Sequence, residues 1–175
     1  MTPGTEPEAS GRADLLRSWR NGIQIMHRSH AQAATAFTRR GRLLAVTALV
    51  LSTVVGTSIF SSINTEPSTA WKVVTGLVSL ASAVFAALQA FLTYPELAER
   101  HRQTELRAGA LRRRLDVLMA RGFEDGDAAE LADLRSLWDE IAESAPVVPQ
   151  GIHRRAETEV LARNRDRVPD APPSP

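Results

Sequence analysis

The stretch "VVTGLVSLASAVFAALQAFLTYP", residues 73–95, carries no charged side chain over its whole length. A second uncharged stretch, "LLAVTALVLSTVVGTSIFSSINT" at residues 43–65, precedes it. A helix of about 20 apolar residues crosses the roughly 30 Å hydrocarbon core of a membrane, so both stretches are long enough. A soluble domain of this size seldom buries two such helices. The two stretches therefore predict membrane spans over residues 43–63 and 73–94.

Arginines gather at the outer ends of the two predicted spans. Arg39, Arg40 and Arg42 precede the first span, whereas the connecting loop 64–72 holds one glutamate and one lysine. The arginines that follow the second span are Arg100, Arg102, Arg107, Arg112, Arg113 and Arg114. Because positive residues stay on the cytoplasmic side, we expect both termini in the cytoplasm and the connecting loop outside. In the loop, Ser68 is expected to cap the second span.

The composition excludes several classes of protein. The 175 residues include 21 Lys plus Arg and 20 Asp plus Glu, a balance that argues against a nucleic-acid binder. The chain has no cysteine, which excludes disulfides and thiolate chemistry. There is no glycine-rich phosphate loop, and His27 and His30 have no carboxylate at a spacing that would complete a metal site. We therefore expect no catalytic residue, no metal and no cofactor, and we expect that the chain is not an enzyme.

Two narrow apolar seams, with steps of three and four residues, flank the spans. The upstream seam comprises Trp19, Ile23, Met26, His30, Ala33 and Phe37, and the downstream seam comprises Leu97, His101, Thr104, Ala108, Leu111, Leu115 and Leu118. This period predicts cytoplasmic helices over 11–42 and 96–121 that pack on each other as an antiparallel pair. His30 and His101 could then face the partner helix, as buried hydrogen-bonded side chains or as a proton switch.

The remaining segments complete an all-α fold: an integral-membrane two-helix hairpin extended by cytoplasmic helices into a helical bundle over residues 11–152. A further helix is expected over 127–144, opened by a capping box of Asp127 and Glu130. The stretch "APVVPQGI" that follows should be extended. Residues 153–175 should form a short helix and a disordered tail, and residues 1–10 a disordered N-terminus.

Small and polar residues form a stripe along the second span: Thr75, Ser79, Ser82, Ala86, Gln89 and Thr93. Phe85, Leu88 and Leu92 are expected on other faces. The first span offers Ala48, Ser52 and Gly56 at four-residue spacing, which lets membrane helices approach closely. Two interpretations stay open: the stripe joins the helices of one hairpin, or it lines a pore when several hairpins assemble.

Pro95 lies where the second span meets the polar helix. It has no N–H to bond back to Phe91, so the helix either restarts or kinks there. Thr93 with Glu96 three residues later predicts a capping box. We therefore expect a hinge at Pro95.

The stretches "LSTVVGTSIF", "GLVSLASAVFAALQAFLTYPELAERH" and "LRRRLD" resemble the SLATT family, the SMODS- and SLOG-associating two-transmembrane effectors of bacteria. The resemblance covers roughly Trp19 to Ile152. It implies a role in antiviral defence, in which a membrane-perforating effector kills or arrests the infected cell (abortive infection). It also implies association with an enzyme that makes nucleotide second messengers or with a protein that senses them, and it brings no catalytic residue.

Two functions of different classes follow. The first is a pore-forming effector, whose partners are the lipid bilayer, further copies of the chain, and a second-messenger nucleotide synthetase or nucleotide-sensing protein. The alternative is a non-conducting membrane anchor or scaffold that recruits partners through its cytoplasmic helices.

Overall fold

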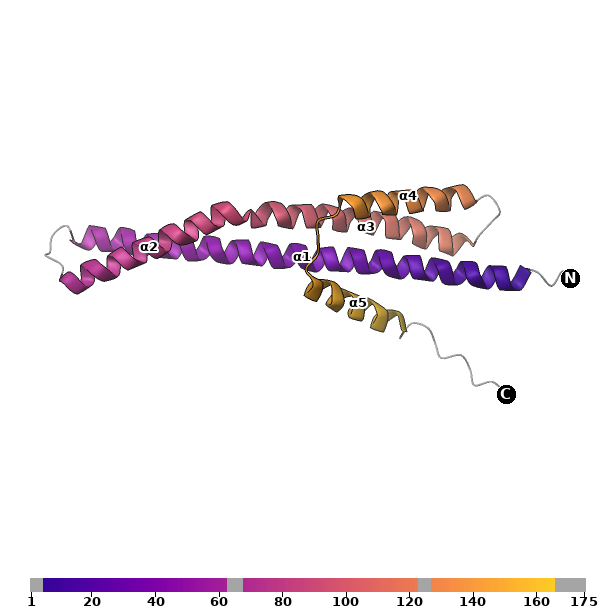
Figure 1. Ribbon diagram of the computed structural model, residues 1–175, viewed down its shortest axis with the longest axis horizontal. Helices are drawn as coiled ribbons and strands as arrows, with labels where there is room; N and C mark the ends of the chain where they lie inside the picture. Colours follow the sequence, from indigo (N-terminus) through magenta and orange to yellow (C-terminus); the bar gives the residue numbers. More distant parts are fainter. Residues whose placement is uncertain (1–4, 63–67, 123–126, 166–175) are drawn as a thin grey trace, which may run out of the picture. The chain divides into compact units, whose positions relative to one another are not determined.

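The computed structural model of the chain describes residues 5–62, 68–122 and 127–165. Within these ranges the chain is helical and has no strand, which confirms the expected all-α class. The helices, labelled in Figure 1, are α1 (Thr5–Ser62), α2 (Thr69–Leu92), α3 (Tyr94–Arg121), α4 (Ala128–Ser144) and α5 (Gln150–Arg165).

The chain divides into two compact units. The apolar unit is Thr35–Ala98, and the bundle unit combines Met1–Ala34 with Glu99–Pro175. Helices α1 and α3 each contribute residues to both units. The two units bury their side chains in different ways, so each is described by itself.

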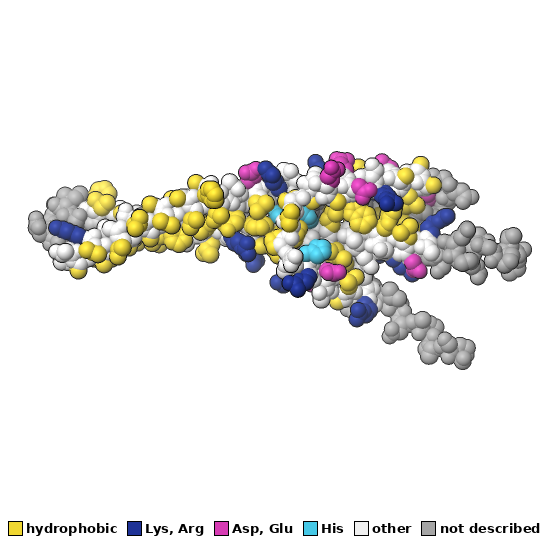
Figure 2. All heavy atoms as spheres, viewed as in Figure 1, with side chains coloured by type: hydrophobic (Ala, Val, Ile, Leu, Met, Phe, Trp, Pro, Cys, Tyr) yellow, Lys and Arg dark blue, Asp and Glu magenta, His cyan; other side chains and the backbone are white. Residues whose placement is uncertain are grey.

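In the apolar unit, α1 and α2 form a hairpin with its apolar surface turned outward. Ser68 caps α2 as expected, since its side chain accepts a hydrogen bond from the Trp71 N–H at 3.4 Å. Both helices are long and apolar enough to cross a membrane, and only 6 % of the most apolar 18-residue window of each is buried. A core helix of a soluble protein would be mostly buried. Hydrophobic side chains accordingly cover this part of the visible surface in Figure 2.

The bundle unit is packed around a core of leucine and isoleucine from α1, α3 and α4. Its buried members are Leu16, Ile23, Leu111, Leu115, Leu118, Leu134 and Ile141. Trp19 of α1 meets Trp138 of α4 edge to face, with ring centroids 6.1 Å apart. A Cβ at Gly22 would lie only 2.8 Å from the Trp138 ring, so the missing side chain lets α4 approach α1.

Two helix starts differ from the sequence expectations. Helix α1 begins at Thr5, so residues 5–10 are helical, while residues 1–4 and the tail 166–175 lie outside the described residues. Helix α5 begins at Gln150, within the segment expected to be extended, because the Ile152 and His153 amides both bond to the Pro149 carbonyl. A turn built on local backbone bonds of this kind leaves no periodic signal in the sequence.

The capping box expected at α4 is wrong. Asp127 has helical backbone angles and makes no side-chain cap hydrogen bond. The carboxylates of Asp127 and Glu130 instead approach the Arg121 guanidinium, at 3.7 and 2.7 Å. Arg121 ends α3, so a cation from the preceding helix competes with the backbone for both acids.

Candidate functional site

The helix break in the apolar unit lies at Thr93, two residues before the expected hinge at Pro95. Thr93 is the C-cap of α2 and has left-handed backbone angles, φ 39° and ψ 32°. Its carbonyl still accepts a hydrogen bond from the Leu97 amide at 3.1 Å, in the first turn of α3. A capping box needs an extended N-cap, so the box expected for Thr93 and Glu96 is not formed. A positive φ at a β-branched residue is strained, and the strain marks the joint between α2 and α3.

Helix α1 covers this break through an aromatic contact and a glycine. Phe37 stacks on Tyr94 with ring centroids 6.0 Å apart, and the Arg40 guanidinium lies 5.6 Å from the Phe37 centroid. A Cβ at Gly41 would lie 3.3 Å from the Tyr94 Cβ and 3.8 Å from the Pro95 ring. Gly41 thus permits the close approach of α1 to the start of α3. Gly41 belongs to no sequence motif, so this contact was not predictable from the sequence.

The predicted stripe on α2 divides between two environments. Thr75 and Ser82 are partly buried, and Ser82 shares a hydrogen bond of 2.8 Å with Ser52 of α1. Phe85 and Leu92 are also partly buried, so they do not lie away from the hairpin contact as expected. The exposed members of the stripe are Ser79, Ala86, Gln89 and Thr93. Interdigitation with α1 follows the larger side chains as well as the small ones, which shifts the contact face around α2.

The small-residue series on α1 divides in the same way. Ala48 is buried and Ser52 contacts Ser82, so both belong to the hairpin contact. A Cβ added at Gly56 would meet no atom within 4 Å. Gly56 therefore makes no close helix contact within the described hairpin.

The seams of α1 and α3 bring His30 and His101 together in the bundle unit. Their Nδ1 atoms are 3.0 Å apart, and the side chains are 4 % and 0 % exposed. Burial, with smaller contributions from His101 and His153, lowers the pKa of His30 from 6.5 to about 4. Burial also lowers the pKa of His101. Both rings are neutral near pH 7, so one Nδ1–H donates to the other Nδ1.

Other seam residues pack as the three-four period indicates. Leu111 and Leu115 belong to the bundle core, Trp19 packs against that core, and Phe37 lies in the apolar unit against Tyr94. Among the described residues, no group of three or more His, Cys, Asp or Glu side chains could hold a metal ion.

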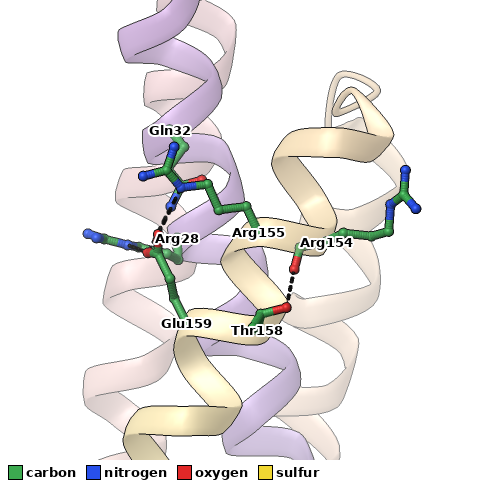
Figure 3. A network of polar contacts seen from close by, with 6 residues as sticks. All are labelled: Arg28, Gln32, Arg154, Arg155, Thr158 and Glu159. Atoms are coloured by element: carbon green, nitrogen blue, oxygen red, sulfur yellow. Dashed lines mark hydrogen bonds and ion pairs between the residues drawn. The ribbon is translucent and has the colours of Figure 1, made fainter.

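Helix α5 is held on α1 mainly by polar contacts. Figure 3 shows Glu159 accepting hydrogen bonds from Arg28 at 3.0 Å, Gln32 at 2.9 Å and Arg155 at 3.0 Å. The bonds from Arg28 and Arg155 lower the pKa of Glu159. One turn on, the Asn164 amide donates to Asn21 at 2.7 Å and to Gln24 at 2.9 Å. Only two α5 side chains, Ala156 and Val160, are buried.

A cavity of about 790 Å³ lies between α1 and the connection from α4 to α5. Its walls are mainly apolar, and its polar side chains include His30, His153 and Arg154. The cavity was not predictable from the sequence, because its walls come from segments more than 110 positions apart in the chain.

Two exposed apolar helices joined to a helical bundle with a buried apolar core define a two-span membrane protein. The chain belongs to the SMODS and SLOG-associating 2TM effector domain family 4, whose profile matches residues 14–127. This match confirms the resemblance drawn from the sequence and supports a membrane effector of a conflict system. It ends before α4, so α4 and α5 lie outside the matched region. No curated protein and no solved structure matches the chain.

Proposed function

We propose that the chain is a defence effector that assembles through its apolar unit and opens a water-filled path across the inner membrane. The observation that carries the proposal is the position of Gln89. It is exposed on α2, whereas Ser82, Phe85 and Leu92 are partly buried in the hairpin. Ser79 and Ala86 are exposed on the same stripe.

An exposed glutamine in the hydrocarbon region is unfavourable unless another polar group or water meets it. A buried amide without a hydrogen bond costs roughly 2–7 kcal/mol, depending on the reference state. The described residues offer Gln89 no hydrogen bond within the hairpin. Contact with further copies of the chain, or with water in a path enclosed by several copies, would satisfy it. Two helices alone cannot enclose such a path, so the proposal requires an oligomer.

The charge pattern supports an orientation with both termini in the cytoplasm. Arg39, Arg40 and Arg42 precede the apolar stretch of α1, and the first arginine after α2 is Arg100. The bundle unit would then lie in the cytoplasm, where an activating partner can reach it. The family description names SMODS and SLOG association, which supports a partner that makes or senses a nucleotide signal. The role proposed for the chain itself is not enzymatic.

A second candidate is a membrane anchor that recruits partners without conducting. Leu106 and Val117 of α3 are 58 % and 60 % exposed on the bundle unit. A groove of about 330 Å³ lies between α3 and α4, lined in part by Leu137 and Arg114. Exposed apolar side chains and a groove are both features of a docking surface, and they favour this alternative.

The test compares Gln89→Leu with a matched change on the same helix, Ser82→Ala. Each protein is expressed in bacteria together with the candidate partner, and membrane potential and growth are followed. Under the pore proposal, wild type depolarises the membrane, Gln89→Leu reduces the rate at least about tenfold because a dry constriction resists ions, and Ser82→Ala stays close to wild type.

Membrane fractionation alongside each measurement shows whether each variant is inserted in the membrane. Depolarisation that survives Gln89→Leu undiminished would remove Gln89 from the path. If inserted wild type never depolarises the membrane but still retains a partner on affinity purification, the anchor function is favoured.

A further inference from the structure

The cavity of the bundle unit has the dimensions of a small-molecule site. Its volume of about 790 Å³ falls within the roughly 300–1,000 Å³ of typical ligand pockets. Ile25 and Met26 of α1 form one apolar wall, and Pro146 and Val148 of the α4–α5 connection form another. Apolar walls of this kind bind the flat or aliphatic body of a ligand.

The charge of the lining has one sign. Arg154 and His153 line the cavity, and no aspartate or glutamate does. Arg154 is exposed, and no ion pair of its guanidinium is found among the described residues. Figure 3 shows Arg154 extending to the side of α5 opposite Arg155, away from the carboxylate of Glu159. A cation at a cavity without a competing acid is suited to an anion.

The first turn of α5 strengthens this preference. Gln150, His153 and Arg154 all line the cavity from this turn. The N-terminal end of a helix carries a partial positive charge, which favours an anion. The helix end thus adds to the positive charge of Arg154.

His30 gives the cavity a further, oriented polar group. Its side chain is only 4 % exposed, lines the cavity, and has its Nδ1 held by His101 at 3.0 Å. This leaves Nε2 as the ring nitrogen that a ligand could meet. When His101 donates to His30 Nδ1, the proton of neutral His30 is on Nε2, where it can donate to an anion. A bound anion would therefore favour one of the two tautomers of the histidine pair.

We propose that this cavity binds a small anion with an apolar body, held by Arg154 and His153 at the mouth and by His30 on the α1 side. The site joins α1, which lies within the family match, to the α4–α5 connection, which lies beyond residue 127. Occupation would tie α5 to α1 in addition to the polar contacts of Glu159 and Asn164. The site thus goes beyond the proposed pore and gives the bundle unit a ligand of its own.

The test is isothermal titration calorimetry of the full chain in phosphatidylcholine nanodiscs, with 1-naphthyl phosphate as the probe and empty nanodiscs as the blank. Saturable binding of one probe per chain is expected. Inorganic phosphate, which lacks the apolar body, and 1-naphthylmethylamine, which carries the opposite charge, should each bind at least about tenfold more weakly.

Arg154→Gln and Arg163→Gln form a matched pair of variants. Both remove one exposed arginine charge from α5, but only Arg154 lines the cavity. Arg154→Gln should weaken naphthyl phosphate binding at least about tenfold, and Arg163→Gln should leave it within about twofold. Ala145→Phe, which places a ring in the cavity, should also weaken it. In a Trp71→Phe background, the fluorescence of Trp19 and Trp138 reports whether each variant keeps the bundle core.

No saturable binding at millimolar probe, equal weakening by the two arginine variants, or equal binding of the amine would overturn the proposal. Repetition in nanodiscs with phosphatidylglycerol distinguishes two sources of the anion. If phosphatidylglycerol weakens probe binding to wild type but not to Arg154→Gln, the natural anion is a lipid headgroup. If probe binding is unchanged, the natural anion is a soluble molecule. Either result upholds an anion site. The assay measures binding alone, so its outcome is independent of whether the chain conducts.

Discussion

The two units use the same helices, α1 and α3, but bury different kinds of side chain. In the bundle unit, Leu111, Leu115 and Leu118 are at most 3 % exposed, whereas Leu77 and Phe91 of the apolar unit are 62 % and 84 % exposed. Burial of large apolar side chains stabilises a bundle in water, but lipid solvates those side chains as well as a neighbouring helix does. Small residues and hydroxyl pairs such as Ser52–Ser82 therefore hold the hairpin. The difference shows that one helix can follow two packing rules along its length.

The largest expected effect comes from truncating the same side chain in the two units. Leu115→Ala leaves a cavity in the bundle core and should lower the free energy of unfolding by roughly 2–5 kcal/mol. Leu77→Ala removes the same atoms from an exposed site and should change it by less than about 0.5 kcal/mol. Denaturant unfolding in nanodiscs, followed by Trp19 and Trp138 fluorescence in a Trp71→Phe background, measures both. Equal effects would break the comparison between the units.

A smaller effect is expected from acid, and only in the bundle unit. The pKa of His30 is lowered to about 4, so between pH 6.5 and 4 the unfolded chain takes up a proton that the folded chain does not. The free energy of unfolding should therefore have its highest value above pH 6.5 and decrease as the pH drops toward 4. The measurement is denaturant unfolding at a series of pH values.

His30→Asn should make this pH dependence shallower, because the lowered pKa values of His101 and His27 then supply what remains of it. A slope between pH 6.5 and 4 that is unchanged in His30→Asn would contradict the assignment. The lowered pKa of Glu159 affects stability in a different pH range. The ionised carboxylate stabilises the folded chain, and this stabilisation is lost only as the pH falls below the usual pKa of 4.5.

The smallest expected effect concerns the joint between α2 and α3. Thr93→Gly relieves the strain of a β-branched residue at φ 39° and should raise the free energy of unfolding by about 1 kcal/mol. The same change at Thr57, inside α1, should lower it by about 1 kcal/mol, because glycine weakens a helix interior. Thermal unfolding in nanodiscs compares the two variants. If Thr93→Gly destabilises as much as Thr57→Gly, the left-handed backbone at position 93 is not the source of strain.

The periodic features of this molecule were predictable from its sequence. Uncharged runs long enough to span a membrane marked α1 and α2, and three-four steps placed His30 and His101 on seams that the structure brings together. Such patterns can be recognised in a sequence because residues one helical turn apart lie in the same environment.

Features that depend on a single backbone angle or on distant segments were not predictable. The left-handed Thr93, the close approach at Gly41 and the attraction of Asp127 to Arg121 each depend on local geometry that leaves no repeat. The cavity is formed where α1 meets a connection from the far end of the chain, so no short motif encodes it. Pro95 was a sound marker of the joint, but the strain lies on its neighbour Thr93.

The long sequence separation within the bundle unit imposes an order on biosynthesis. Arg20 pairs with Asp116 at 2.7 Å across 96 positions, and Asn21 bonds to Asn164 across 143. At translation rates of about 5–20 residues per second, the N-terminal half of α1 waits roughly 5–20 s for α3 to emerge. Both spans are synthesised within that interval. The bundle thus closes only after both spans have been made. In a chain stalled at the translocon, Leu16 and Ile23 remain accessible to chaperones and proteases.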